Sequence, residues 1–261
     1  MRRTLSLLAL IGVVVVAFVV SGTAGAGRRA VDAGTSFKYC DNPTFPPMEN
    51  QTAGGKPTGF DIDFANALAS QMGGKATFVF SSFSGLLPAL GAKRCDVVIS
   101  GIFITPDRTK QFPAVSYMHS HRALIVAGGN PKHITKPTDL KGKSVAVQAG
   151  TKYAAYLQAL QKKIGFTLRT YPGDTDAIGQ ILIGRADAVL SQDTSAAYAM
   201  SKHPGKVAIG YLFPATDEFG VYYRRGDAIG STIATSINAL KANGTLRNLA
   251  VKYHIPTGDV K

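Results

Sequence analysis

Two features of the chain could bind a carboxylate or another small anion. Arg108 carries a planar guanidinium that can donate two parallel hydrogen bonds to a carboxylate, although a lone arginine usually lies on a helix surface. Gly150, Thr151 and Lys152 follow an apolar run and open a helical pattern. The free N–H groups and the dipole at a helix N-terminus favour an anion, and a simple N-cap role for Thr151 is compatible with this.

Catalytic and metal-binding patterns are weak in the same sequence. No nucleophile–base pair stands out, and the five histidines show no metal-ligand spacing. His119 and His121 flank a single residue and would share a face of a strand, where we interpret them as surface or hinge residues. We therefore expect no metal and no cofactor.

The elements that must position these residues alternate between strand and helix. Strand-like runs and helical patterns first alternate over residues 37–40, 61–72, 76–80, 85–92 and 96–100. The alternation then restarts over residues 144–148, 151–164, 166–171, 175–183 and 188–191. Extended apolar segments cover 122–127 and 221–223, and the last helices break at Asn243-Gly244. This order predicts an α/β protein of two lobes, each with a parallel sheet and helices on both faces.

The first 26 residues have the pattern of a secretory signal peptide. Arg2 and Arg3 precede an apolar run over residues 5–20, and Ala24-Gly25-Ala26 offers a cleavage site. The alternative is an uncleaved membrane anchor, but the run is shorter than the roughly 20 residues that span a bilayer. The sequence therefore predicts export to the periplasm.

Composition limits the remaining possibilities. Cleavage would leave about 235 residues and lower the formal net charge from +13 to about +11. The lysines and arginines are scattered, so we interpret the charge as solubility and attraction to anionic partners, not nucleic-acid binding. Cys40 and Cys95 lie in strand-like apolar runs, and although export permits a disulfide, we expect two free, buried cysteines.

The segment GFDIDFANALASQM, residues 59–72, carries a family signature. Taken alone, it is also compatible with an amphipathic surface helix whose first turn holds Asp61 and Asp63. It resembles the signature of the polar amino-acid branch of periplasmic solute-binding proteins (family 3). Other segments similar to that family follow in its order: FPPM at 45–48, FSGLLPAL at 83–90, SGIFITPDR at 100–108, VAVQAGT at 145–151 and GRADAVL at 184–190.

The resemblance covers about residues 35–255 and implies the two-lobed type II periplasmic-binding-protein fold. Each lobe would hold a mostly parallel sheet flanked by helices, and two crossover segments would join the lobes. The resulting expectation is a signal peptide at 1–26, lobe 1 at 35–117 and 222–261, lobe 2 at 121–217, and a hinge at 118–120 and 218–221.

The resemblance also implies a ligand site in the cleft between the lobes. Arg108 would anchor a ligand carboxylate from one lobe, and the helix start at Thr151 and Lys152 would hold it from the other. Phe45 and Phe83 would bracket the carbon stem of the ligand, with a place in the hydrophobic core as the alternative for each.

Two further positions follow from the same resemblance, and two depart from it. Asp41 would meet an amine or a polar ligand group, or cap a loop, and the carbonyl of Gly101 would face the ammonium. Phe103 replaces the usual hydroxyl residue. Gln192 replaces the usual ammonium-binding aspartate, and Asp193 follows one position later.

An aromatic cage for a substituted amine is the alternative interpretation of this head-group site. Phe45, Phe83 and Phe103 together could hold a substituted or methylated amine by cation–π attraction.

The function implied is that of a soluble receptor for an ATP-driven importer. It would capture an amino acid or a related carboxylate, close, and deliver it to a membrane permease of an ABC transporter, without covalent chemistry. A monomer is expected. Two alternatives stay open: a cyclohexadienyl dehydratase using Asp41, Asp193 or Glu218 as general acid, and a sensor module with the same cleft.

Overall fold

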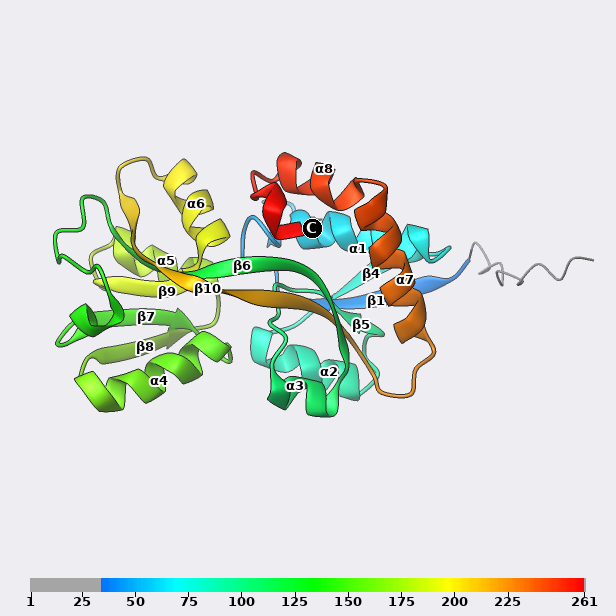
Figure 1. Ribbon diagram of the computed structural model, residues 1–261, viewed down its shortest axis with the longest axis horizontal. Helices are drawn as coiled ribbons and strands as arrows, with labels where there is room; N and C mark the ends of the chain where they lie inside the picture. Colours follow the sequence, from blue (N-terminus) through cyan, green and yellow to red (C-terminus); the bar gives the residue numbers. More distant parts are fainter. Residues whose placement is uncertain (1–33, 261) are drawn as a thin grey trace, which may run out of the picture. The chain divides into compact units, whose positions relative to one another are not determined.

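The computed structural model describes residues 34–260, so the predicted signal peptide at 1–26 lies outside the described part of the chain. An eight-stranded sheet with the order β4-β1-β5-β10-β6-β9-β7-β8 runs through this part (Figure 1). β2 and β3 form a separate two-stranded sheet. The strands are β1 (Ser36–Asp41), β2 (Asn50–Gln51), β3 (Pro57–Thr58), β4 (Lys75–Phe80), β5 (Val97–Val98), β6 (Ala114–Ala127), β7 (Ser144–Gln148), β8 (Thr167–Tyr171), β9 (Ala188–Gln192) and β10 (Val207–Tyr223).

Helices flank both halves of this sheet. They are α1 (Phe60–Gln71), α2 (Leu86–Gly91), α3 (Pro106–Gln111), α4 (Lys152–Ile164), α5 (Asp174–Leu182), α6 (Asp193–Lys202), α7 (Ile229–Ala242) and α8 (Thr245–Lys252), with short 3-10 turns at Phe83–Gly85, Pro137–Leu140 and Thr257–Val260. We call β1, β4, β5, α1–α3, α7 and α8 lobe 1, and β7–β9 with α4–α6 lobe 2. None of the helices within residues 34–260 is long and apolar enough to cross a membrane.

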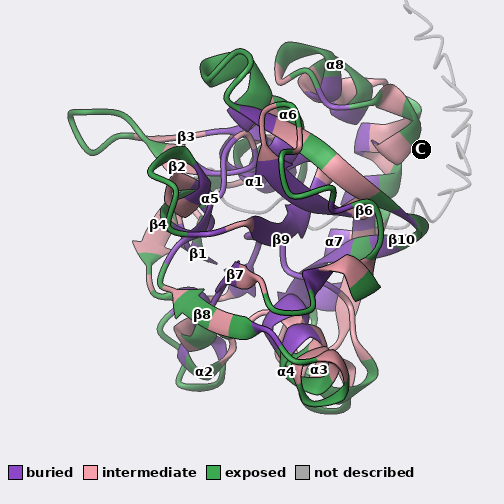
Figure 2. Cartoon of the chain, turned by 90° about the vertical axis from the view of Figure 1, so that its left-hand side faces the viewer, coloured by how far each residue is buried: buried purple, intermediate pink, exposed green. Residues whose placement is uncertain are grey.

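The central strands of each lobe are buried on both faces because alternate residues pack against opposite helices. In β7, Val145 and Val147 belong to the same core as Leu157 of α4, whereas Ala146 packs in a second core with Ile178 of α5. Strand β9 is buried along its whole length, whereas β8 at the sheet edge carries exposed residues (Figure 2). Such two-sided burial is typical of parallel strands.

The strands within each lobe pair in parallel, and two long strands connect the lobes. β1 pairs in parallel with β4 and β5, and β7 does so with β8 and β9. β6 and β10 run antiparallel side by side through the middle of the sheet (Figure 1). Both are longer than predicted, because polar residues such as His119, Ser120 and Asp217 interrupt their apolar pattern without interrupting their pairing. Helices α3 and α6 were not predicted.

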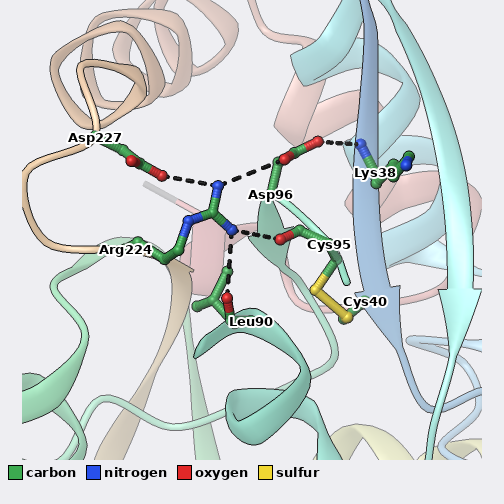
Figure 3. Close-up of polar contacts among 7 residues, drawn as sticks. All are labelled: Lys38, Cys40, Leu90, Cys95, Asp96, Arg224 and Asp227. Carbon is green, nitrogen blue, oxygen red and sulfur yellow. Dashed lines mark hydrogen bonds and ion pairs between the residues drawn. A yellow bond between two sulfur atoms is a disulfide. The ribbon is translucent and has the colours of Figure 1, made fainter. Parts of the chain in front are cut away.

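The end of β10 is fixed to lobe 1 by Arg224. Its guanidinium donates to the carbonyl of Cys95 and forms ion pairs with Asp96 at 3.5 Å and Asp227 at 2.9 Å (Figure 3). Asp96 also accepts a hydrogen bond from the backbone N–H of Lys38 at 3.0 Å. These contacts hold β10 beside β5, after which the chain continues into α7 and α8.

The expectation of free cysteines is wrong: Cys40 and Cys95 form a disulfide (Figure 3). Cys40 lies in β1, and Cys95 precedes β5, which pairs with β1 through Tyr39 and Val97. The pairing brings the two Cα atoms to 5.6 Å, within the range that a disulfide needs. A separation of 55 residues in the sequence conceals this proximity.

Candidate ligand-binding cleft

A small cavity lies between the lobes. Six of its lining residues were expected at the ligand site: Phe45, Phe83, Gly101, Phe103, Thr151 and Gln192. The other six were not: Val147, Gln148, Tyr153, Asp174, Leu190 and Ser191. Its volume of about 20 Å³ is close to the space of one water molecule. Four other expected residues, Asp41, Arg108, Lys152 and Asp193, do not line it.

Aromatic rings form much of the lobe 1 wall. Phe103 stacks on Phe219 of β10, with ring centroids 4.9 Å apart, and lies 5.1 Å from Tyr153 of α4. Phe45 meets the same Phe219 ring edge-on at 6.3 Å. Gly101 has a φ of 50°, and a Cβ there would lie 2.6 Å from the Phe45 ring, so this backbone position needs glycine.

Arg108 lies where the two lobes meet. It belongs to α3, which Thr105 caps by accepting from the backbone N–H of Arg108. Its guanidinium donates to the carbonyl of Phe103 at 2.9 Å and to that of Gly150 in lobe 2 at 3.5 Å. It also lies 5.7 Å from the centre of the Phe83 ring. The arginine and the start of α4 therefore face each other across the cleft.

The N-terminus of α4 is built as the sequence suggests. Thr151 accepts from the backbone N–H of Ala154 at 3.1 Å and donates to the carbonyl of Gln148 at 2.8 Å. Thr151 is thus an N-cap as well as a lining residue. Because Thr151 lines the cavity, the N-terminus of α4, where the helix dipole favours negative charge, lies at the cavity wall.

Lys152 and Asp217 form a charged pair at the edge of the cleft. The Lys152 ammonium contacts the Asp217 carboxylate and lies 4.6 Å from the centre of the Phe103 ring. Asp217 of β10 also lies 3.4 Å from Arg122 of β6 and accepts from the hydroxyl of Tyr153 at 3.3 Å. Lys152 is therefore paired with the protein itself.

The end of β9 directs neighbouring residues to different places. Gln192, the last residue of the strand, is 4% exposed and lines the cavity, and its Oε1 has no hydrogen-bond partner among residues 34–260. Asp193, the first residue of α6, accepts from the hydroxyl of Ser120 at 2.7 Å and from the backbone N–H of Thr194 at 2.8 Å. Consecutive positions in an extended chain face opposite sides, which explains the divergence.

Asp174 is a carboxylate in the cavity wall that the sequence analysis missed. It opens α5, is 4% exposed, and accepts from the hydroxyls of Ser191, at 2.6 Å, and Ser195. Burial raises its pKa to about 6, and the two hydroxyls oppose this rise. Pro172-Gly173 before a helix was the available signal, since it places an acid in a first turn at the end of a strand.

A group of buried acids supports the lobe 1 wall from behind. Asp41, Glu49 and Asp61 are each 1% exposed. Asp61 accepts from the backbone N–H of Gly101 at 2.7 Å and from the hydroxyl of Tyr117 at 2.8 Å. Burial, and for two of these acids the charge of Asp61, raises the pKa of all three, with that of Asp61 at about 6. This group fixes the backbone of Gly101.

Comparison with known families identifies the chain. The model of the bacterial extracellular solute-binding proteins, family 3, matches residues 37–256. The chain belongs to this family. As the resemblance implied, the fold of this solute-binding protein is the two-lobed type II fold, which its structural neighbours share.

Relatives of this solute-binding protein are named for amino acids. The L-cystine-binding protein TcyJ of Escherichia coli is 32% identical over 212 residues, 80% of this chain and 79% of the relative. The lysine/arginine/ornithine-binding periplasmic protein of E. coli is 29% identical, over 80% of this chain and 84% of the relative.

Solved structures agree with these relatives. An ancestral arginine-binding protein bound to arginine superposes with a TM-score of 0.79 at 31% identity, over 84% of this chain and 97% of that one. An ancestral amino acid-binding protein described as a precursor of cyclohexadienyl dehydratase gives 0.77 at 29% identity, over 84% and 95%.

Proposed function

We propose that this protein is the extracytoplasmic receptor of an ABC importer, and that it captures an amino acid or a close derivative between its lobes. The family membership and the amino-acid-binding relatives support the solute class. The observation that carries the assignment to this cleft is the position of Arg108 opposite the N-terminus of α4.

The two sides of the cleft supply complementary grips on one carboxylate. The guanidinium of Arg108 can donate two parallel hydrogen bonds from lobe 1. The N–H groups that open α4, next to Thr151, can donate from lobe 2. The contact between Arg108 and the Gly150 carbonyl supports this arrangement, because it brings the guanidinium next to the residue that precedes Thr151. A carboxylate there would replace this contact and bridge the lobes.

Capture requires that the lobes separate and close again. The cavity of about 20 Å³ is too small for an amino acid, so the ligand enters when the lobes move apart. Contacts such as that of the Gln148 side chain with Asn42, at 2.9 Å, and of the Thr175 N–H with the Thr44 carbonyl, at 3.1 Å, join the lobes in this structure. A ligand that contacts both lobes favours the closed form. We propose residues 118–120 and 218–221 as the hinge.

A ligand screen tests this function. Purified mature protein is assayed by thermal shift and then by calorimetry with the standard amino acids, L-cystine, opines, betaines and polyamines. A ligand at 100 times its Kd should stabilise the protein by about 2.7 kcal/mol. The Arg108→Ala variant should bind at least tenfold more weakly, whereas Arg247→Ala, an exposed arginine on α8, should bind normally. A screen without any binding amino acid or derivative would contradict the proposal.

An enzymatic role is the second candidate, and two observations favour it. Asp174 is a cavity acid with a pKa of about 6, and one structural neighbour is a precursor of cyclohexadienyl dehydratase. Asp41 and Asp193, two of the acids considered from the sequence, do not line the cavity, and neither does Glu218. Incubation with prephenate or arogenate distinguishes the two roles, because only an enzyme releases an aromatic product. We propose binding without turnover.

A further inference from the structure

The cavity wall contains one carboxyl group, that of Asp174, to which the proposed solute-binding function has not yet assigned a role. Asp174 is the only acid among the twelve residues that line the cavity. Asp217 pairs with Lys152 and Arg122, and Asp193 accepts from Ser120. Asp41 has an Oδ1 without a hydrogen-bond partner among residues 34–260, but it does not line the cavity. Any cationic group of a ligand in this cavity therefore meets Asp174 as its carboxylate partner.

An amino acid brings a cation into the cleft along with its carboxylate. Burial of an ammonium without a negative partner is costly, and a neutral amide such as Gln192 does not balance its charge. Gln192 does offer its Oε1, which has no hydrogen-bond partner in the described part of the chain. Each oxygen of Asp174 accepts one serine hydroxyl and can accept a further hydrogen bond. An ammonium has three donors to share between these acceptors.

We propose that Asp174 is the counter-ion of the ligand's α-ammonium, and that the Gln192 Oε1 accepts a second hydrogen bond from it. This inference rests on the proposed amino-acid-binding function. It places the carboxylate that binds the ammonium at the N-terminus of α5, and not at the end of β9, where the family usually has an aspartate and this chain has Gln192. Arg108 and the α4 N-terminus then select for the carboxylate of the ligand, and Asp174 selects for its ammonium.

Ligand affinity should depend on pH if Asp174 binds the ammonium. The groups that bond to Asp174, Ser191 of β9 and Ser195 of α6, are uncharged hydroxyls, and Gln148 of β7 beside it in the cavity wall is neutral too. Burial raises the pKa of the free carboxyl to about 6, and only its ionised form pairs with an ammonium. Affinity should therefore rise with pH through 6 and level off above 7. The ionised fraction predicts about tenfold weaker binding at pH 5 than at pH 7.

Calorimetry with paired probes tests the proposal. L-arginine is compared with 5-guanidinopentanoate, and L-cystine with 3,3′-dithiodipropionate, which lack only the α-ammonium groups. If another amino acid binds most tightly in the screen, its deamino acid is added. The wild type should prefer the amino acid at least 30-fold. Asp174→Asn should lose most of this preference, and Asp176→Asn, an exposed acid on the same helical turn, should keep it.

The outcomes distinguish a failure of the proposed function from a failure of the assignment of Asp174. If the wild type binds no amino acid, the proposed function fails. If it binds one but Asp174→Asn keeps the full preference, the assignment of Asp174 is overturned and the function stands. Should Asp174→Asn not fold, the wild-type pH profile decides: the tenfold change must occur for the amino acid and be absent for its deamino analogue, and equal profiles overturn the assignment.

Discussion

Asp61 and its neighbours Asp41 and Glu49 make the folded protein bind protons more tightly than the unfolded chain. Burial raises the pKa of all three, and that of Asp61 is about 6 instead of 3.8. Protonation of these carboxyls therefore stabilises the folded state relative to the unfolded chain. This stabilisation is complete below the pKa of the unfolded chain and is lost as pH rises through the pKa of the folded protein. We predict that the Tm is higher at pH 5 than at pH 7.5, by several degrees, in scanning calorimetry.

Two variants show whether the buried acids cause this pH dependence. Asp61→Asn should reduce the Tm difference between pH 5 and pH 7.5, because one of the titrating groups is gone. Asp107→Asn, whose side chain is 92% exposed, should keep it. A wild-type Tm that falls on acidification over this range would contradict the prediction.

Some residues of the candidate site could be predicted from the sequence, and others could not. Phe45, Gly101 and Phe103 could be placed at the cavity because their segments, FPPM and SGIFITPDR, resemble segments of the family. Asp174 was not placed there: Pro172-Gly173 before a helix puts an acid at the end of a strand, but the contacts of this acid come from β9 and α6, which pack beside it. Which of Gln192 and Asp193 faces the cavity depends on one residue of register at the end of β9, which the sequence pattern does not determine, and in the structure it is Gln192.

At the level of elements, periodicity predicted the strands and helices that are buried on regular faces. The helix at 61–72 is α1, at Phe60–Gln71, and the strand at 144–148 is β7, with the predicted bounds. The pattern failed for β6 and β10, whose polar middle sections are held by pairing with each other. It also failed for α3 and α6, because a six-residue helix is too short to show a period and α6 starts directly from the end of β9.

The disulfide between β1 and the start of β5 is an element-level feature with a measurable effect. It closes a long loop, and loss of a native disulfide of this kind typically costs about 2–5 kcal/mol. We predict that the Cys40→Ala, Cys95→Ala double variant has a Tm lower by roughly 5–15 °C. A reductant should lower the Tm of the wild type and leave that of the variant unchanged. Equal Tm values for both proteins would refute a stabilising bridge.

For the whole molecule, the surfaces that meet across the cleft decide how readily the lobes close. Gly173 of lobe 2 lies against Thr44 of lobe 1, where an added Cβ would come within 2.8 Å of the Thr44 Cβ. The backbone of Gly173, with φ −120° and ψ 156°, suits any residue, so alanine is not strained there. Within lobe 2 the added Cβ would also lie 3.0 Å from the carboxylate of Asp176, which is the end of a flexible side chain and can shift, so the tighter contact with Thr44 arises only when the lobes meet. A methyl group at this position should therefore disfavour the closed form and leave the separated lobes undisturbed.

Gly173→Ala should consequently weaken ligand binding without lowering the Tm of the free protein. Overpacking of a tight contact costs about 1–3 kcal/mol, which corresponds to a loss of affinity of about 5- to 150-fold. Calorimetry measures the affinity, and small-angle scattering with and without ligand measures closure. Gly179→Ala is the matched control on the same helix, because a Cβ there meets no atom within 4 Å, and it should bind like the wild type. If Gly173→Ala binds as tightly as Gly179→Ala, these surfaces do not meet in the ligand-bound protein and the proposed closure is wrong.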